Sequence, residues 1–157
     1  MRHTAFISSA LTYLQDSPLD RALFYRGDPT VLGLFEFNGR YRKSASVFKL
    51  FGAMLDTPQR LSVSGTDDRG LTLLAGRSAD QNLVQLIITQ YGGRAGAEYK
   101  LNLQNLPWGE SEFEVRRYKI SEDPFSPKEP FIGQGGKFQT AGSLSENDVE
   151  FIILRKR

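Results

Sequence analysis

Beyond Arg60, the apolar residues of this 157-residue chain recur at every second position. Successive side chains of a β-strand point to opposite faces, so this period of two predicts strands with one apolar and one polar face. Turn-forming residues separate the runs about every ten residues, which is the spacing of an antiparallel β-sandwich. The alternating positions include Leu61, Val63, Tyr99, Leu101, Leu103, Phe113 and Val115.

Two runs in the same region, 83–88 and 149–154, are apolar on both faces. A strand that is buried on both faces lies between two layers, so we expect the first run at the centre of a sheet and the second as a closing strand. The apolar positions change parity between Arg116 and Arg117, which predicts a β-bulge there. The segment 121–136 is rich in proline and glycine and is predicted to be a long loop.

The first 58 residues follow a different pattern. Apolar residues at helical spacing predict a helix from Thr4 to Leu14, with Thr4 as its N-cap. Two strand-like runs follow at 22–26 and 32–37. Asn38 and Gly39 then predict a hairpin turn, because both tolerate a positive φ angle.

A second helix is expected to begin at Ser44, as its N-cap, and to end before Pro58. Gly52 within it indicates either close packing or a surface position that tolerates glycine. Its apolar face is formed by Val47, Phe48, Phe51, Met54 and Leu55. The chain is thus predicted to be mainly β: an antiparallel β-sandwich at 59–157 with a small N-terminal α/β appendage of two helices at 1–58.

Composition excludes several classes of function. The net charge is only +2 and basic residues are dispersed, so no nucleic-acid partner is predicted. The chain has no cysteine and one histidine, His3, which argues against a zinc site and a histidine-based triad. We expect no metal and no cofactor. No signal peptide or transmembrane segment is predicted, because polar residues interrupt the apolar runs.

The run YRGDPTVLGLFEFNGRYRKSASVFKLFGAMLDTPQRLSVSG, from Tyr25 to Gly65, resembles the C-terminal part of barrel glycosidases related to glycoside hydrolase family 39. The LAGRSAD turn and the NLPWG loop resemble the β-sandwich that follows the barrel in that family. The resemblance implies that 22–26 matches the last barrel strand and that 44–55 matches the last barrel helix. The appendage would then be the remnant of a barrel edge.

Enzymes of this kind use two carboxylates, an acid/base and a nucleophile, about 5 Å apart when they retain configuration. By the resemblance both would lie upstream of Met1, so no residue of this sequence inherits a catalytic role. The resemblance therefore implies a non-catalytic accessory sandwich that stabilises a catalytic barrel. Two alternatives are a carbohydrate-binding module and a glycosidase that is active only with a missing barrel portion.

Six residues are candidates for contact with carbohydrate. Tyr25, Arg26 and Asp28 would lie at the end of the last barrel strand, where such barrels build their active sites; the alternative is a surface ion pair around a turn. Trp108 is the only tryptophan, and an exposed indole suits stacking on a sugar ring, with Tyr91 or Phe125 beside it. The alternative for Trp108 is a plug at the end of the sandwich.

The remaining acidic residues favour structural roles. Glu112 and Glu114 share one face of a strand with Arg116, which predicts an ion-pair ladder rather than an acid/base pair. Asp67-Asp68 and Glu122-Asp123 are predicted to be turn residues rather than calcium ligands. The expected partners are a glycosidase barrel or a polysaccharide. A homodimer through the apolar residues of the appendage is a further expectation.

Overall fold

The computed structural model describes residues 2–66, 70–92, 97–121 and 128–157. Its described part contains two α-helices and eight strands. The elements are α1 (Arg2–Leu14), α2 (Lys43–Ala53) with a 3₁₀ turn (Met54–Asp56), β1 (Gln59–Arg60), β2 (Leu71–Arg77), β3 (Leu83–Gln90), β4 (Ala97–Leu103), β5 (Glu112–Lys119), β6 (Phe131–Gln134), β7 (Phe138–Leu144) and β8 (Val149–Lys156).

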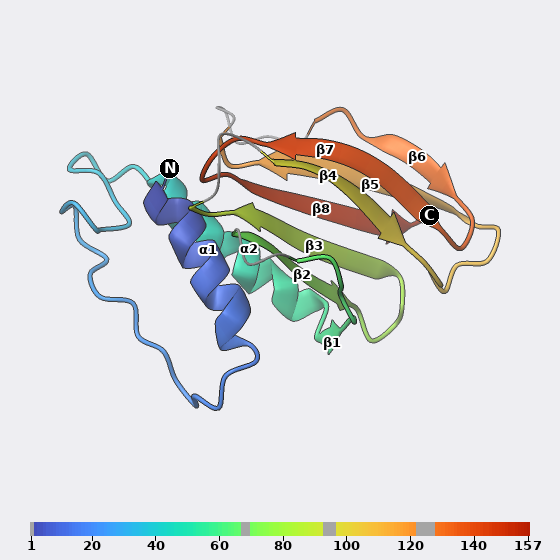
Figure 1. The fold of residues 1–157 in the computed structure, drawn as a ribbon, viewed down its shortest axis with the longest axis horizontal. Coiled ribbons are helices and arrows are strands. Elements are labelled where there is room, and N and C mark those ends of the chain that lie inside the picture. The colour runs from blue at the N-terminus through green and yellow to red at the C-terminus, as the bar shows by residue number, and fades with distance from the viewer. Residues whose placement is uncertain (1, 67–69, 93–96, 122–127) are drawn as a thin grey trace.

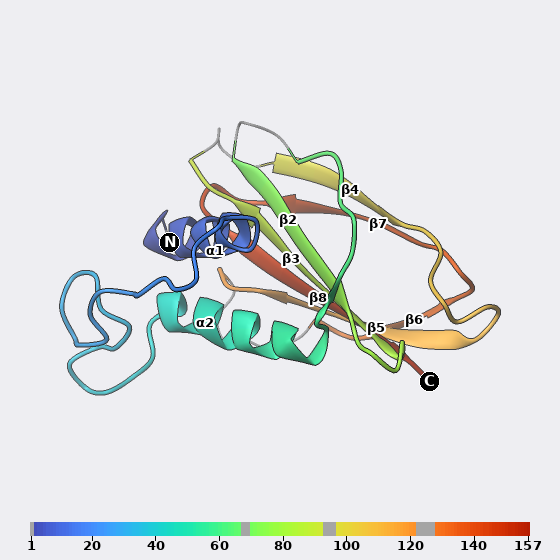
Figure 2. The same ribbon diagram turned by 90° about the horizontal axis from the view of Figure 1, so that it is seen from below.

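The strands form two antiparallel sheets that face each other. The larger sheet has the order β1-β2-β3-β8-β5-β6, and the smaller one consists of β4 and β7. The two helices cover the outer face of the larger sheet, so the molecule has three layers (Figures 1 and 2). The predicted architecture, a mainly β sandwich with a small helical appendage, is confirmed.

The central strands are those whose sequences are apolar on both faces. All eight residues of β3 are buried, and β3 pairs with β2 on one side and β8 on the other. Val84, Leu86 and Ile88 face the core between the sheets. Ile87 faces the second core, between the larger sheet and the helices. The sequence pattern therefore placed 83–88 correctly.

Helix α1 lies against the sheet through small and hydroxylated side chains. Ala5 and Ser8 are fully buried, and the Ser8 hydroxyl is hydrogen-bonded to that of Thr89 on β3 at 2.7 Å. Because these side chains are short, the helix approaches the sheet closely. The predicted apolar stripe only partly coincides with this face, since Phe6 is half exposed.

Neither predicted N-cap is correct. Helix α1 already includes Arg2, and Thr4 is a buried residue within it. Helix α2 has Arg42 in the N-cap position, and Ser44 is buried inside the first turn. The second helix also ends earlier than predicted, so Leu55 lies in the 3₁₀ turn and is 80% exposed.

The predicted strand at 22–26 is not formed. Extended backbone becomes a strand only when a neighbour accepts its hydrogen bonds, and none of the described strands pairs with this run. Arg26 also has a φ of 78°, which lies in the left-handed region and is incompatible with a strand. The predicted hairpin is reduced to one bridge between Phe35 and Tyr41, with Gly39 at positive φ in its turn.

The predicted β-bulge is also wrong, because β5 pairs with β8 in unbroken register from Phe113 to Lys119. The change in parity has another cause. Phe113 and Val115 fill the core between the sheets, whereas Tyr118, on the opposite face, packs in the core under the helices. Within the predicted loop 121–136, β6 pairs with the first half of β5, so that part of the prediction is corrected as well.

Candidate functional site

Tyr25, Arg26 and Asp28 form a cluster on the long connection between α1 and α2. The Arg26 guanidinium lies over the Tyr25 ring, 5.7 Å from its centroid. Its Nε donates a hydrogen bond of 2.9 Å to Asp28 Oδ2. The Thr30 hydroxyl donates a hydrogen bond of 2.6 Å to the other carboxylate oxygen. The sequence thus identified three residues that the fold brings together.

The electrostatics of this cluster keep Asp28 ionised. The hydrogen bond from Thr30, followed by that from Arg26, lowers the pKa of the Asp28 carboxyl below its usual range. Its negative charge holds the guanidinium in place. The Tyr25 ring is 77% exposed, so it offers an aromatic face next to an oriented charged pair. Such a group can contact a sugar or a partner protein.

Trp108 does not offer an exposed ring. Its side chain is only 4% exposed, its ring centroid lies 5.0 Å from that of Phe113, and its Nε1 donates a hydrogen bond to the Gln81 carbonyl at 2.6 Å. Stacking on a sugar requires a free ring face, which this indole lacks. The carbohydrate role predicted for Trp108 is therefore corrected in favour of the plug at the end of the sandwich.

Tyr91 does not lie beside Trp108. Tyr91 follows the last residue of β3 and packs on Phe6 of α1, with ring centroids 5.5 Å apart. Gln81, which holds the indole, precedes the first residue of β3. The length of that strand, roughly 25 Å, separates the two places. Phe125, the third aromatic of the predicted group, lies outside the described residues.

Acidic residues elsewhere are held by specific partners. Glu114 forms an ion pair with Arg116, which agrees with the predicted ladder. Glu150 is fully buried between the sheets, where it accepts hydrogen bonds from Tyr99 Oη at 2.6 Å and from Arg117 Nε at 2.7 Å. Within the described ranges, no group of acidic or histidine side chains could hold a metal ion. Asp67-Asp68 and Glu122-Asp123 lie outside those ranges.

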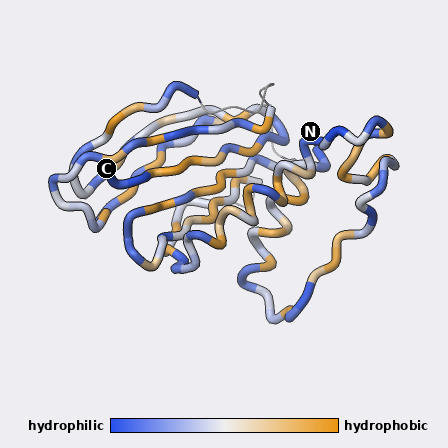
Figure 3. Tube along the Cα trace, turned by 180° about the vertical axis from the view of Figure 1, so that it is seen from behind, coloured by the Kyte–Doolittle hydropathy of each residue, from blue (hydrophilic) through white to orange (hydrophobic). Residues whose placement is uncertain are grey.

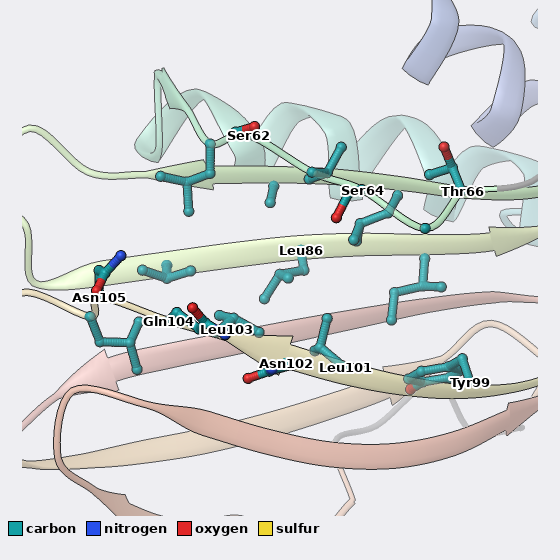
Figure 4. A pocket seen from close by; sticks show the side chains of 18 of the residues that line it. Ser62, Ser64, Thr66, Leu86, Tyr99, Leu101, Asn102, Leu103, Gln104 and Asn105 are labelled. Atoms are coloured by element: carbon teal, nitrogen blue, oxygen red, sulfur yellow. The ribbon is translucent and has the colours of Figure 1, made fainter.

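A cleft of about 710 Å³ opens between the two sheets, and sequence reasoning missed it. Segment 61–66 lines one side and β4 with the following residues lines the other. Apolar side chains of β2 and β3 form its floor, with Leu86 between the two sides in Figure 4. The available signal was the alternation at 61–63, because this strand-like segment continues from β1 beside β2 only as far as the hydrogen bond from Leu61 N to the Ala75 carbonyl oxygen and is irregular beyond it.

Comparison with known proteins connects this fold to carbohydrate-active enzymes. No protein-family profile matches the sequence, and no curated protein sequence matches it. Among solved structures, a glucosidase from Croceicoccus marinus is 26% identical, with a TM-score of 0.88 over 98% of this chain. The chain resembles the C-terminal region of a family 39-like glycoside hydrolase.

Two further structures share the fold at lower identity. A family 39 enzyme from Xanthomonas axonopodis pv. citri has a TM-score of 0.66 at 14% identity over 98% of this chain. A family 30 xylanase from Clostridium acetobutylicum has a TM-score of 0.68 at 13% identity over 99%. The chain spans about two fifths of these structures: 41%, 41% and 40% of the glucosidase, the family 39 enzyme and the xylanase. None of the described helices is long and apolar enough to cross a membrane.

Proposed function

We propose that this chain is a non-catalytic accessory region of a glycoside hydrolase-like protein, which packs against the catalytic barrel and stabilises it. The observation that carries the proposal is the match of 98% of the chain to 41% of the glucosidase at a TM-score of 0.88. The matched part of that enzyme is thus less than half of its length. In this proposal the catalytic residues belong to the part of the enzyme outside the matched region.

An exposed apolar surface supports packing against a large partner. Leu23, Val31 and Phe37 are 95%, 89% and 89% exposed. We define the apolar N-terminal surface as Leu19, Leu23, Val31, Leu32, Phe37 and Tyr41. These residues lie on the connection that extends away from the sheets, and hydrophobic stretches recur along it (Figure 3). Apolar surface concentrated in this way marks an interaction site.

Complementation tests the proposal directly. The probe is the part of the Croceicoccus marinus glucosidase outside the matched region, expressed alone or together with this chain. We expect the chain alone to leave aryl glucosides intact, and co-expression to increase the yield of soluble barrel. Turnover by the isolated chain would contradict the non-catalytic role. An unchanged barrel yield would contradict the stabilising role.

A second candidate function is contact with carbohydrate through Tyr25, Arg26 and Asp28. It is favoured by the exposed Tyr25 ring beside a guanidinium that Asp28 orients. Affinity electrophoresis in gels containing xylan or glucan measures it. Retention that is lost in Tyr25→Ala but kept in Tyr13→Ala, an exposed tyrosine of α1, supports this function. Migration that is equal with and without polysaccharide contradicts it.

A further inference from the structure

Asn38 is the one asparagine of the sequence that precedes a glycine, Gly39. The pair lies at the tip of the turn between Phe35 and Tyr41, on the connection that extends away from the sheets (Figures 1 and 2). Both residues of the pair are exposed. The other asparagines precede leucine or aspartate: Asn82, Asn102, Asn105 and Asn147. Because glycine has no side chain, the nitrogen that follows Asn38 is the least shielded from its carboxamide.

The turn positions the carboxamide of Asn38. The Arg40 backbone N–H donates a hydrogen bond to Asn38 Oδ1 at 3.0 Å. A donor at this oxygen stabilises the negative charge that develops there when a nucleophile attacks Cγ. The Gly39 nitrogen lies between these two groups in the chain, and a Cβ atom at Gly39 would have nothing within 4 Å. The carboxamide is therefore polarised, and distant parts of the described chain do not screen the nitrogen that attacks it.

A hydrogen bond within the turn opposes this attack. The Gly39 N–H donates to the Glu36 carbonyl oxygen at 2.9 Å, and this bond must break before the nitrogen attacks. The bond lies in an exposed turn, so water replaces the lost partner. Its loss therefore slows the reaction by no more than about tenfold. Asn102 is held more firmly, because it is paired with Gln139 within the sheet of β4 and β7.

We propose that Asn38 is a site of spontaneous deamidation that limits the lifetime of the apolar N-terminal surface. The Gly39 nitrogen forms a bond to Asn38 Cγ and passes its proton to hydroxide. The bond between Cγ and Nδ2 breaks, and Nδ2 leaves as ammonia after taking a proton from water. Water then opens the succinimide ring at either carbonyl, which yields aspartate or isoaspartate. The net reaction exchanges the side-chain amide for a carboxylate and consumes only water.

Deamidation places a negative charge beside the apolar N-terminal surface. Phe37 precedes Asn38 and is 89% exposed, and Tyr41 is 76% exposed. The charges already present in this turn are those of Glu36 and Arg40, which offset each other. The new carboxylate therefore makes the turn negative. A charge beside a docking apolar surface loses water without gaining a partner, which weakens binding.

Isoaspartate also changes the shape of the turn. Its backbone runs through the former side chain, so the chain between Phe37 and Gly39 becomes longer by a carbon atom. The turn depends on matched hydrogen bonds, which include the bond from Glu36 N–H to the Arg40 carbonyl oxygen at 2.8 Å. A longer chain does not keep this register, so Phe37 changes its position. The effect on docking rests on the proposed function, because the barrel is the partner.

Peptide mapping tests the covalent step on the chain alone. Trypsin cuts after Arg26 and Arg40, and the peptide 27–40 contains Asn38 as its only amide side chain. Incubation of the purified chain should raise the mass of this peptide by the difference between an amide and an acid. The rate should rise about tenfold per pH unit above neutrality, because the deprotonated nitrogen is the attacking species. Labelling by an isoaspartyl methyltransferase should detect the isoaspartate product.

The other asparagines and one variant supply the controls. Asn38→Gln, whose longer side chain closes a larger ring, should leave the peptide 27–40 unchanged over the same period. Equal rates at all asparagines overturn the proposal, as does an unchanged peptide 27–40 in the parent chain. Aspartate without isoaspartate would show hydrolysis without a ring and overturns it too. We expect conversion about tenfold slower, or slower still, at the remaining asparagines Asn82, Asn102, Asn105 and Asn147.

Docking measures the consequence for the apolar N-terminal surface. The chain, before and after incubation, is mixed with the barrel part of the Croceicoccus marinus glucosidase, and sedimentation velocity measures the bound fraction. This fraction should fall in proportion to the converted fraction, whereas Asn38→Gln incubated equally should keep it. Equal docking by fresh and converted chain overturns the effect on the surface. If the fresh chain does not dock, the proposed function fails and the effect on the surface fails with it, while the deamidation site stands on the peptide map.

Discussion

At the scale of single residues, the most constrained group is the buried network of Tyr99, Arg117 and Glu150. Arg117 donates through Nε to Glu150 and through Nη2 to the Tyr99 hydroxyl at 2.7 Å. It also reaches Thr140 on β7, so the network joins both sheets. A carboxylate without exposed surface is tolerable here because its charge is paired and hydrogen-bonded.

This network predicts a loss of stability in alkali. Burial, then the hydrogen bond to Glu150 and its negative charge, raise the pKa of the Tyr99 hydroxyl above its usual range. The folded state therefore holds this proton more tightly than the unfolded state. Its contribution is complete below the unfolded pKa of about 10 and decreases as the pH rises above that value. Urea unfolding between about pH 8 and 11 measures the decrease.

The control for that prediction is Tyr99→Phe. This variant has no hydroxyl to ionise, so its stability should fall less steeply with pH above 10 than that of the parent chain. At neutral pH it should be less stable by about 1–2 kcal/mol, since Glu150 and Arg117 each lose a hydrogen-bond partner. Parallel pH profiles of the two proteins would show that Tyr99 does not control alkaline stability.

Trp108 leads to a second prediction at this scale. Trp108→Ala should lower the free energy of unfolding by about 3–5 kcal/mol, because it leaves a cavity next to Phe113 and removes the donor to Gln81. Trp108→Phe keeps an aromatic ring there and should cost less. Denaturant titration measures both. A stable Trp108→Ala variant with lost polysaccharide retention would restore the binding role in place of the plug.

At the scale of elements, replacement of glycine by alanine should have opposite effects on the stability of the fold at two positions. A Cβ atom at Gly76 on β2 would collide with the carbonyl oxygen of Thr57, where the chain passes from the helices to the sandwich. Gly76→Ala should therefore destabilise the fold by about 1–3 kcal/mol. A Cβ atom at Gly52 in α2 has nothing within 4 Å, so Gly52→Ala should stabilise by about 0.5–1 kcal/mol through helix propensity. Thermal unfolding of the two variants measures the change in melting temperature. Equal changes in both variants would contradict the close contact between position 76 and the Thr57 carbonyl oxygen.

The strands that sequence reasoning identified are those whose pattern reports burial directly. The runs 83–88 and 149–154 are covered on both faces, and the apolar residues at successive positions of each run indicate this burial. β5 misled the prediction because its outer face is exposed at Glu112 and Arg116 but packs on the core under the helices at Tyr118. The same face of β5 thus has two environments along its length. In the sequence this appears as a change in the parity of the apolar residues, which is also the pattern that a β-bulge produces.

At the scale of the whole molecule, sequence predicted the layers better than the sites. The sandwich and its helices follow from local periodicity, which each segment carries on its own. The cleft does not, because it depends on which edges the topology leaves without a neighbour. Likewise, whether Trp108 is exposed depends on the distant Gln81 and not on its own loop. Tyr25, Arg26 and Asp28 were found together because they are neighbours in sequence.

The last prediction concerns the apolar N-terminal surface as a whole. In the triple variant Leu23→Ser, Val31→Ser and Phe37→Ser, each replaced side chain is at least 89% exposed. The free energy of unfolding of the isolated chain should therefore change by no more than about 0.5 kcal/mol per site. Its association should weaken strongly, because removal of apolar area from water drives docking of such surfaces. Sedimentation velocity of the chain alone measures homodimer formation, and a mixture with the barrel part of the glucosidase measures docking. Association that is unchanged in the triple variant would show that the surface serves neither partner.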